Sequence, residues 1–524
     1  MNILFIMADQ LRWDYLSCAG HPHLHTPNID ALAARGVRFT RAFVQGPVCG
    51  ASRMSTYTGR YVVSHGSAWN FVPLSLGIRT LGDHLRAGGM RCAVVGKTHV
   101  EPDLEGARRL GLDIGQGPGQ LAMEGGFEPW ERFDGILPPG FKGDGVRYND
   151  WLRAQGYGGD NPWHDHANSA LGDGGEVLSG WRLRWADRPA RVADRHGETA
   201  YTTDRAIDFI REQGDAPWLL HLSYIKPHWP YVVSAPYHAM YGPSQMLPVV
   251  RGDAELRDPH PVMRGYQATD PSVAFSRDEV RARVVPTYMG LVRQIDDHLG
   301  RLFAFLRESG RERDTMIVFT SDHGDYLGDH GLGEKELFHD CIVKVPLIVV
   351  DPRPAADATR GRTVDALVEA IDLAPTFVEA TGAPAAPEWL EGRSLQPWLH
   401  GEAPAARGEW RDAVFSENSY AFRDPVRLPL GRPVDGCQMT MVRTGRWKYV
   451  HFEGLRPQLF DLEADPDELN DLGADPAHAA VREAMAARLF DWLRQRKTMV
   501  NIRHQDIESW NRREVEAGIL IGQW

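Results

Sequence analysis

The sequence predicts an α/β fold in which helices sandwich a large, mostly parallel β-sheet, followed by a smaller antiparallel α+β unit. Three observations support this prediction. Continuous apolar runs of strand length are typical of central parallel strands that are covered on both faces. These runs alternate with segments of helical length, which is the pattern of βαβ units. Beyond Pro397 the apolar segments become short and are separated by tight turns, which indicates the second unit.

The first expected strand, residues 2–8, is a continuous apolar run that ends in Asp9 and Gln10. Further strands are expected where apolar runs of similar length recur, at residues 91–95, 218–225, 315–320 and 345–350. Residues 39–45 form another short apolar segment, which leads into a turn that contains Pro47. Helices are expected from Thr26-Pro27 to Gly36, from Leu81 to Gly88, at 200–213 and at 277–309.

We interpret residues 1–400 as a catalytic α/β domain and residues 401–524 as a smaller C-terminal α+β domain. Within the first, residues 101–200 contain Gly and Trp without periodicity, and we interpret them as ordered loops that cover the pocket. The second contains three expected strands, a helix and a polar tail, at residues 413–417, 438–443, 448–453, 477–496 and 498–524. The tail is a candidate subunit-contact arm.

Composition excludes several classes of protein. With 524 residues, of which 43% are hydrophobic and 24% charged, the chain can bury a large core. Its formal charge of −12 argues against nucleic-acid binding, which favours a basic face. No apolar run reaches membrane-spanning length, and the opening residues lack the features of a signal peptide. Five cysteines without a CxxC pair indicate neither a disulfide framework nor a zinc site, so we expect a cytoplasmic protein.

The chain is organised around Cys49, which follows the Pro47 turn and opens a short expected helix, residues 52–58, closed by Gly59. A helix N-terminus favours anions through its free N–H groups and its dipole. Arg53, one turn further on, can direct two donors to an oxyanion at the same place. An isolated cysteine is more often a buried structural residue. In this setting we interpret Cys49 as a reactive centre instead.

Polar residues cluster at the carboxyl ends of four expected strands. They are Asp9-Gln10, Lys97-Thr98-His99, Lys226 with His228, and Asp322-His323. In open α/β sheets ligands bind outside the carboxyl ends of the strands, so these clusters are expected to meet on one rim. A single polar residue after a strand is often only the start of a loop. Two carboxylates, two lysines and three histidines on one rim are harder to explain in that way.

Asp9, Asp322 and His323 form a candidate site for one divalent metal ion. Carboxylates combined with an imidazole suit Mn²⁺, Ca²⁺ or Mg²⁺, and the nitrogen ligand favours Mn²⁺ with Ca²⁺ as the alternative. Taken alone, Asp322 could instead be a helix N-cap. His228 lies between prolines, which hold the chain extended and direct the imidazole.

The motif from Cys49 to Arg53, Cys-Gly-Ala-Ser-Arg, together with the later Thr-Gly-Arg, resembles the signature of the sulfatases and of the similar phosphonate monoester hydrolases. Both belong to the alkaline phosphatase superfamily. The resemblance implies an alkaline-phosphatase-like fold and oxidation of Cys49 to formylglycine by a formylglycine-generating enzyme, with the hydrated aldehyde as the nucleophile. The family usually has proline where this chain has Ala51, a known variant.

The resemblance also implies roles for the polar rim. Asp9, Asp322 and His323 would hold the metal together with the nucleophile at position 49, and Gln10 and Asn70 would bind substrate.

Five further residues would act on the substrate itself. Lys97, Lys335 and Arg53 would hold the non-bridging oxygens and the diol. His228 would protonate the leaving oxygen, and His99 would take the proton from the second hydroxyl.

The function expected from these features is a metal-dependent hydrolase of sulfate monoesters, of arylsulfatase type, with phosphonate monoesters as second substrates. Lys97 and His99 resemble sulfatases proper. Gln10 and His323 resemble the other branch, whose main activity would be phosphonate monoester or phosphodiester hydrolysis. A two-metal phosphatase or phosphomutase with Ser52 as the attacking residue would need a second ligand cluster.

An alternative hypothesis, from a different class of protein, is a non-catalytic binding protein with unmodified Cys49. The expected partner is a small sulfate or phosphonate ester rather than nucleic acid or a membrane. Related enzymes form dimers or tetramers, so the resemblance also implies a homodimer or homotetramer.

Overall fold

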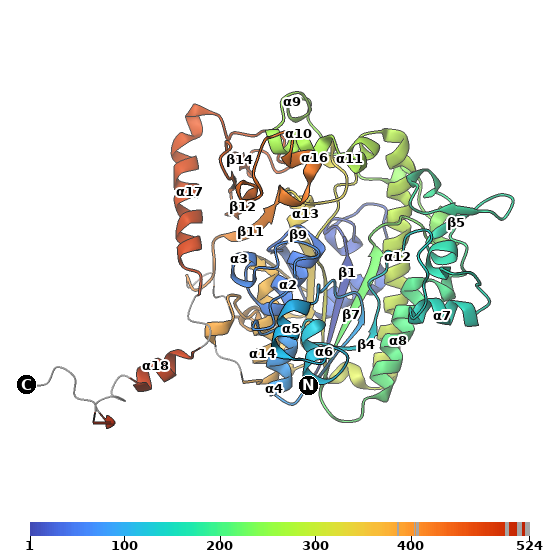
Figure 1. Cartoon of the computed structure of the whole chain (residues 1–524), viewed down its shortest axis with the longest axis horizontal. Coiled ribbons are helices and arrows are strands. Elements are labelled where there is room, and N and C mark those ends of the chain that lie inside the picture. Colours follow the sequence, from blue (N-terminus) through green and yellow to red (C-terminus); the bar gives the residue numbers. More distant parts are fainter. Residues whose placement is uncertain (385–386, 403, 405–407, 498–501, 511–515, 519–524) are drawn as a thin grey trace, which may run out of the picture.

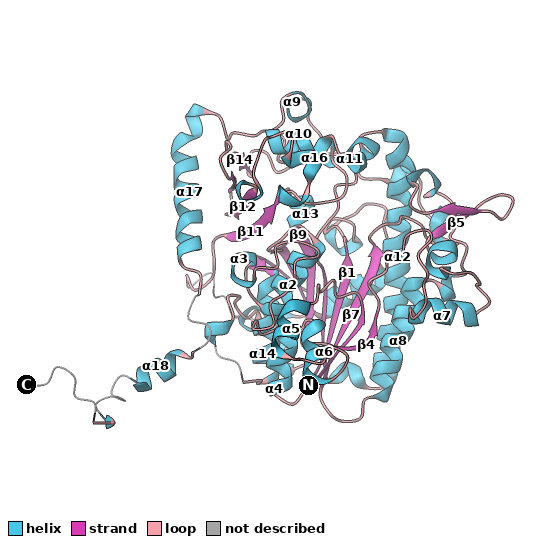
Figure 2. Ribbon diagram, viewed as in Figure 1, coloured by secondary structure: helices cyan, strands magenta, loops and turns pink. Residues whose placement is uncertain are grey.

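The fold is described from a computed structural model of the chain, which places residues 1–384, 387–402, 404, 408–497, 502–510 and 516–518. Its main feature is a sheet of eight strands, seen as magenta arrows in Figure 2. In spatial order the strands are β10 (Arg362–Glu369), β2 (Val37–Phe43), β9 (Lys344–Val350), β8 (Thr315–Ser321), β1 (Asn2–Asp9), β7 (Trp218–Pro227), β3 (Arg91–Gly96) and β4 (Glu128–Arg132). Within it β9 runs opposite to its neighbours, and the other pairings are parallel.

The central strand β1 explains how this sheet is covered. Its alternate residues face opposite cores: Leu4 and Ile6 lie in one, Phe5 and Met7 in the other. The first core is completed by α1 (Pro27–Arg35), α8 (Glu198–Glu212) and α12 (Asp278–Glu308). The second is completed by α2 (Cys49–Thr58), α4 (Leu81–Ala87) and α14 (Leu373–Thr381). Figure 1 shows the sheet between these two layers of helices.

A second, antiparallel sheet lies near the carboxyl end of the chain. Its strands follow one another as β11 (Val414–Ser419), β12 (Gln438–Arg443), β13 (Trp447–Phe452) and β14 (Gln458–Asp461). The helix α17 (Ala479–Arg494) packs against it through Trp492, whose ring stacks on Phe415 at 4.5 Å. In Figure 1 this helix lies along the left side of the main body.

The predicted fold class is confirmed, and the expected strands and helices are present within a few residues of their predicted ends. Residues 101–200 are more regular than expected. They contain α5 (Leu104–Leu110), α6 (Gly117–Met123), α7 (Arg147–Ala154), the hairpin of β5 (Ser169–Leu171) and β6 (Val177–Ser179), and the edge strand β4. The predicted tail at 498–524 lies partly outside the described residues. Its described part contains the helix α18 (His504–Trp510). None of the helices described has the length and apolar character needed to span a bilayer.

Candidate active site and metal centre

Cys49 is the first residue of α2, and the chain reaches it in an extended conformation through Val48. The helix ends at Gly59, whose φ of 63° is left-handed and suits glycine. At the start of the helix, the Gly50 N–H donates to Asn70 Oδ1 at 2.7 Å. A Cβ at position 50 would lie 3.0 Å from that oxygen, so glycine allows this close approach. Asn70 therefore fixes the first turn of the helix that carries Cys49.

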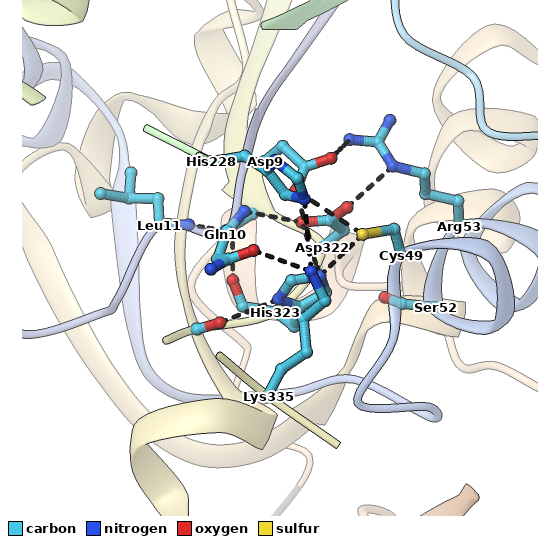
Figure 3. A network of polar contacts seen from close by, with 12 residues as sticks. Asp9, Gln10, Leu11, Cys49, Ser52, Arg53, His228, Asp322, His323 and Lys335 are labelled. Atoms are coloured by element: carbon cyan, nitrogen blue, oxygen red, sulfur yellow. Dashed lines mark hydrogen bonds and ion pairs between the residues drawn. The ribbon is translucent and has the colours of Figure 1, made fainter. Parts of the chain in front are cut away.

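Four side chains meet around one point, as Figure 3 shows. The sulfur of Cys49 lies 3.0 Å from His323 Nε2 and 3.7 Å from Asp9 Oδ1. The fourth member is Asp322, and the ligating atoms of all four lie within 4.8 Å of one another. They come from the end of β1, the start of α2 and the segment after β8. Because β1 and β8 are parallel neighbours, their carboxyl ends meet at the same edge of the sheet.

The cluster fits a divalent ion by the chemistry of its donors. Two carboxylates and an imidazole are present, and all are buried. His323 Nδ1 lies 2.8 Å from the Gly324 carbonyl oxygen, to which it donates, so Nε2 is left as the free donor atom toward the centre. No other group of this kind occurs in the part of the chain that the structure describes. The two-metal alternative with Ser52 therefore lacks its second cluster there.

Arg53 joins the two carboxylates. Its Nε donates to Asp322 Oδ2 at 2.8 Å, and one terminal nitrogen lies 3.1 Å from Asp9 Oδ2. The other terminal nitrogen donates to the Lys97 carbonyl and to the Ser223 hydroxyl. Sequence reasoning expected these donors to hold an oxyanion of the substrate. The structure directs them to protein groups instead, because the helix places the guanidinium behind the carboxylates.

The charges around Cys49 favour an anion there. Burial alone would raise the pKa of the Cys49 thiol, but Lys335, Lys97 and His323 lower it well below its usual range. Burial would likewise raise the pKa of Asp9, whereas the charges of Lys97, His228 and Arg53 hold it below its usual range. The surroundings of position 49 therefore favour a negative charge there.

Two lysines supply much of this positive charge. Lys97 Nζ lies 2.6 Å from Asp9 Oδ2, and no hydrogen-bond acceptor among the described residues engages it further. Lys335 Nζ donates to Gln10 Oε1 at 2.8 Å and lies 3.3 Å from His228 Nε2. Both ammonium groups are buried. Each has three N–H donors, and these contacts leave at least one of them available to an anionic ligand.

His228 is held as a neutral acceptor. Its Nδ1 lies 2.7 Å from the Trp229 carbonyl, to which it donates, so Nε2 faces Lys335 with its lone pair. Burial, together with the charges of Lys335 and Lys97, lowers the pKa of His228 to about 4. The expected proton donor thus carries no proton on Nε2 near neutral pH, and Lys335 is the group that bears one.

Sequence reasoning missed the residues that orient Gln10. Asp325 Oδ2 accepts from Gln10 Nε2 at 2.6 Å and from the Tyr231 hydroxyl at 2.5 Å. The amide oxygen of Gln10 therefore points to Lys335. The signal was available, since Asp325 follows Asp322 by three residues and Tyr231 follows the His228 segment.

His99 is not joined to the cluster by any hydrogen bond among the described residues. It is half-buried beyond the end of β3, and its ring lies 6.3 Å from that of Phe71. Its Nδ1 is buried without a partner. Its expected role as a base stays a prediction.

Comparison with known proteins places the chain in a family. A model described as "Sulfatase" matches residues 1–383. This chain belongs to the sulfatase family. A second model, described as "N-sulphoglucosamine sulphohydrolase, C-terminal", matches residues 328–495. The predicted membership of the alkaline phosphatase superfamily is thereby confirmed.

Similar proteins carry names that describe different activities. A multifunctional alkaline phosphatase superfamily protein, PehA from Trinickia caryophylli, is 32% identical over 94% of this chain and 95% of its own length. An arylsulfatase from Clostridium perfringens is 26% identical over 90% of each chain. The crystal structure of a phosphonate monoester hydrolase from Agrobacterium radiobacter is 31% identical, has a TM-score of 0.78 and covers 94% of this chain and 95% of that one. Membership of the sulfatase family implies a metal ion and a formylglycine. The cluster contains candidate metal ligands, and Cys49 is the residue from which a formylglycine could be made.

Proposed function

We propose that this sulfatase-family hydrolase cleaves sulfate monoesters, aryl esters in particular, and accepts phosphonate monoesters as second substrates. One observation carries the proposal: the side chain of Cys49 lies inside the cluster of Asp9, Asp322 and His323. A nucleophile and an electrophilic metal site in one buried place are what ester hydrolysis at a charged centre requires.

Cofactor and modification follow from the same cluster. Asp9, Asp322 and His323 would hold a divalent ion, Mn²⁺ rather than Ca²⁺ because one ligand is nitrogen. When bound, the ion supplies Lewis acidity, and formylglycine, made from Cys49 by a formylglycine-generating enzyme, supplies a geminal diol as the nucleophile. Arg53 contacts the outer oxygens of Asp9 and Asp322 and would leave their other oxygens available to the ion.

The chain's own residues would handle the substrate's charge. Lys97 and Lys335 present buried ammonium groups that bind the non-bridging oxygens. Lys335 also contacts His228, so the two form a pair that can deliver a proton to the leaving oxygen. Gln10 fixes Lys335 through its amide oxygen, and Asn70 fixes the backbone next to position 49.

The second candidate is a hydrolase whose main substrates are phosphonate monoesters. Gln10 and His323 at the cluster and the similarity to the Agrobacterium enzyme favour it. The charge of the site does not separate the two, because a sulfate monoester and a phosphonate monoester each carry one negative charge. They differ in one substituent, an oxygen in the sulfate and a carbon in the phosphonate. Discrimination therefore depends on whether a donor such as Lys97 meets that substituent.

The test compares kcat/KM for 4-nitrophenyl sulfate and 4-nitrophenyl phenylphosphonate. We expect hydrolysis of both with the sulfate preferred, and a loss of several orders of magnitude in the Cys49→Ala variant. Cys92→Ala is the matched control, because Cys92 is also buried but lies in β3 away from the cluster. Intact mass of the wild-type protein should show the thiol replaced by an aldehyde.

Other outcomes have clear meanings. A preference for the phosphonate would reverse the order of the two candidates. Full activity in Cys49→Ala would exclude the mechanism. A wild-type protein that retains no metal after dialysis and hydrolyses neither ester would be the binding protein with unmodified Cys49. Size-exclusion chromatography with light scattering tests the predicted homodimer or homotetramer.

A further inference from the structure

A cavity of about 870 Å³ lies beside the reaction centre. Its walls come from the segment around η3 (Leu183–Trp185), from α11 (Asp270–Phe275), from the start of α12 and from the loop after β7. Cavities of this size hold small organic ligands of several rings. None of the residues to which we assign a catalytic or metal-binding role lines it, so it is a separate compartment of the site.

Trp229 is the wall between this cavity and the reaction centre. It lines the cavity, and its ring lies 4.4 Å from that of His228 and 5.9 Å from Lys335 Nζ. Glu334, the neighbour of Lys335, also lines the cavity. The leaving group of an ester bound at Lys335 would therefore lie against Trp229 and Glu334, at the boundary of this cavity.

The cavity is rich in aromatic rings. Trp181 and Trp185 are half-buried on one side, and Phe275 is buried on the other. Trp181 packs edge-on against Trp229, with ring centres 5.3 Å apart at 65°. Indole faces held in fixed orientations stack on flat ligand rings at little entropic cost. This lining favours a flat ring over a flexible alkyl chain.

The charges at the mouth favour an acidic substituent on that ligand. Arg182 and Arg184 are exposed there, and neither forms an ion pair in the part of the chain that the structure describes. The Arg184 guanidinium lies 4.7 Å from the centre of the Trp185 ring. Two further arginines of the lining, Arg277 and Arg283, are each paired with a carboxylate. The free donors are therefore those beside the tryptophans.

Carboxylates of the lining do not reverse this balance. Glu279 is the partner of Arg277, and Glu334 Oε2 lies 3.9 Å from Lys335 Nζ. Asp270 is exposed at the start of α11. Among the described residues, a quaternary ammonium ligand, which aromatic cages also bind, would meet two arginines without an ion pair and one aspartate without one.

We propose that this cavity is the leaving-group subsite and that it takes a fused or extended aromatic group with an anionic substituent, which Arg182 and Arg184 bind while Trp181 and Trp185 stack on the rings. The inference rests on the proposed function, because it names the ester that the hydrolase would cleave: the sulfate or phosphonate ester of an acidic phenol of more than one ring.

Binding tests the subsite without any turnover. The probe is 6-hydroxy-2-naphthoate, titrated by tryptophan fluorescence into wild-type protein and into Cys49→Ala. We expect both to bind it alike, and Trp185→Ala and the double variant Arg182→Gln/Arg184→Gln to bind it about tenfold more weakly. Phe490→Ala, an exposed aromatic on α17, and Arg108→Gln/Arg109→Gln, an exposed pair on α5, are the matched controls and should bind as wild type.

Kinetics tests the same subsite in the reaction. For wild type we expect kcat/KM to be higher for 6-carboxy-2-naphthyl sulfate than for methyl sulfate, and Trp185→Ala to lower the first by about tenfold with the second unchanged. The Arg182→Gln/Arg184→Gln variant should lose the advantage of the carboxylated ester over plain 2-naphthyl sulfate.

The two proposals fail separately. If neither ester is hydrolysed but the naphthoate binds as described, the proposed function fails and the subsite stands. If esters are hydrolysed but Trp185→Ala and the arginine variant match wild type in binding and kinetics, the subsite is wrong. Tighter binding of choline than of the naphthoate would also overturn it.

Discussion

Arg53 is not a candidate metal ligand, but it contacts two of them. It contacts the outer oxygens of Asp9 and Asp322, the two carboxylates of the cluster. Burial and the neighbouring Asp9 charge raise the pKa of Asp322, and Arg53 opposes that rise. Without a rigid cation between them, two buried carboxylates would repel each other and turn apart.

The first prediction concerns this contact. Arg53→Lys keeps the positive charge but loses the fork that holds two carboxylates at once. We expect Mn²⁺ affinity to fall by about 10- to 100-fold, measured by calorimetric titration of the chelator-treated protein.

Arg411→Lys is the matched control, because Arg411 is also buried and also joins two carboxylates, Glu369 and Asp372, away from the site. It should lower thermal stability and leave Mn²⁺ affinity unchanged. Equal losses of affinity in the two variants would contradict the role given to Arg53.

The sequence predicted which residues meet in the cluster better than it predicted how their side chains are oriented. Asp9, Asp322 and His323 could be found because each follows an apolar strand, and parallel strands bring such ends together. The direction of a side chain depends on neighbours from distant segments. The donation of Arg53 to two carboxylates and the neutral state of His228 depend on packing that no local pattern encodes.

At the scale of elements, the segment that carries Lys335 is held by the second sheet. Glu334 and Glu336 on either side of Lys335 have φ of 64° and 97°, a region that costs non-glycine residues energy. Asn418 of β11 donates to the Glu336 carbonyl at 2.7 Å. Arg423, just after β11, donates to the Glu336 carboxylate at 2.8 Å. These contacts keep a strained loop in place and so position Lys335.

The second prediction follows. In Asn418→Ala we expect kcat for 4-nitrophenyl sulfate to fall by about 10- to 100-fold, because Lys335 moves from its position. Metal content and the folded state, followed by circular dichroism, should not change. Asn470→Ala, which removes an exposed amide in the C-terminal part of the chain, is the control and should match wild type. An unchanged kcat in Asn418→Ala would show that β11 does not position the loop.

Elements at the edges of the sheet were the ones that sequence reasoning missed. The strand β4 reads Glu-Pro-Trp-Glu-Arg and is mostly half-buried, so it lacks the apolar run that identifies β1. Five of the eight residues of β10 are likewise exposed or half-exposed. Central strands are covered on both faces and therefore carry their signal in composition, whereas edge strands depend on a neighbour that is distant in sequence.

At the scale of the whole molecule, Glu417 joins the two sheets. Its backbone N–H donates to the Gln45 carbonyl after β2, and its carboxylate accepts from the Val63 N–H at 3.1 Å. Burial raises the pKa of Glu417 to about 7, against the hydrogen bond from Val63 and the charge of Arg496. Glu391 adds to the rise.

The third prediction is a pH dependence of stability. Because the pKa of Glu417 is higher in the folded protein than its ordinary 4.5, its protonated form favours folding. That contribution is complete below the ordinary pKa and is lost as pH rises through about 7. We expect Glu417→Gln and wild type to have about the same free energy of unfolding at about pH 5. At about pH 8 the variant should be more stable by up to about 3 kcal/mol, which thermal unfolding would show as a higher midpoint. An unchanged difference across this range would contradict the assignment, and Glu463→Gln, which is exposed, is the control.

The position of Cys49 has one further consequence, for the order of events in the cell. All ten residues of α2 are buried, and the sulfur-bearing side chain is 1% exposed. The proposed formylglycine-generating enzyme could not take this side chain into its own active site once α2 has packed into the core. We therefore expect maturation and folding to compete in time, with oxidation acting while the segment is still extended. A chain that folds first would keep its thiol. The fraction of active enzyme would then depend on the rate of oxidation at position 49 relative to the rate of folding.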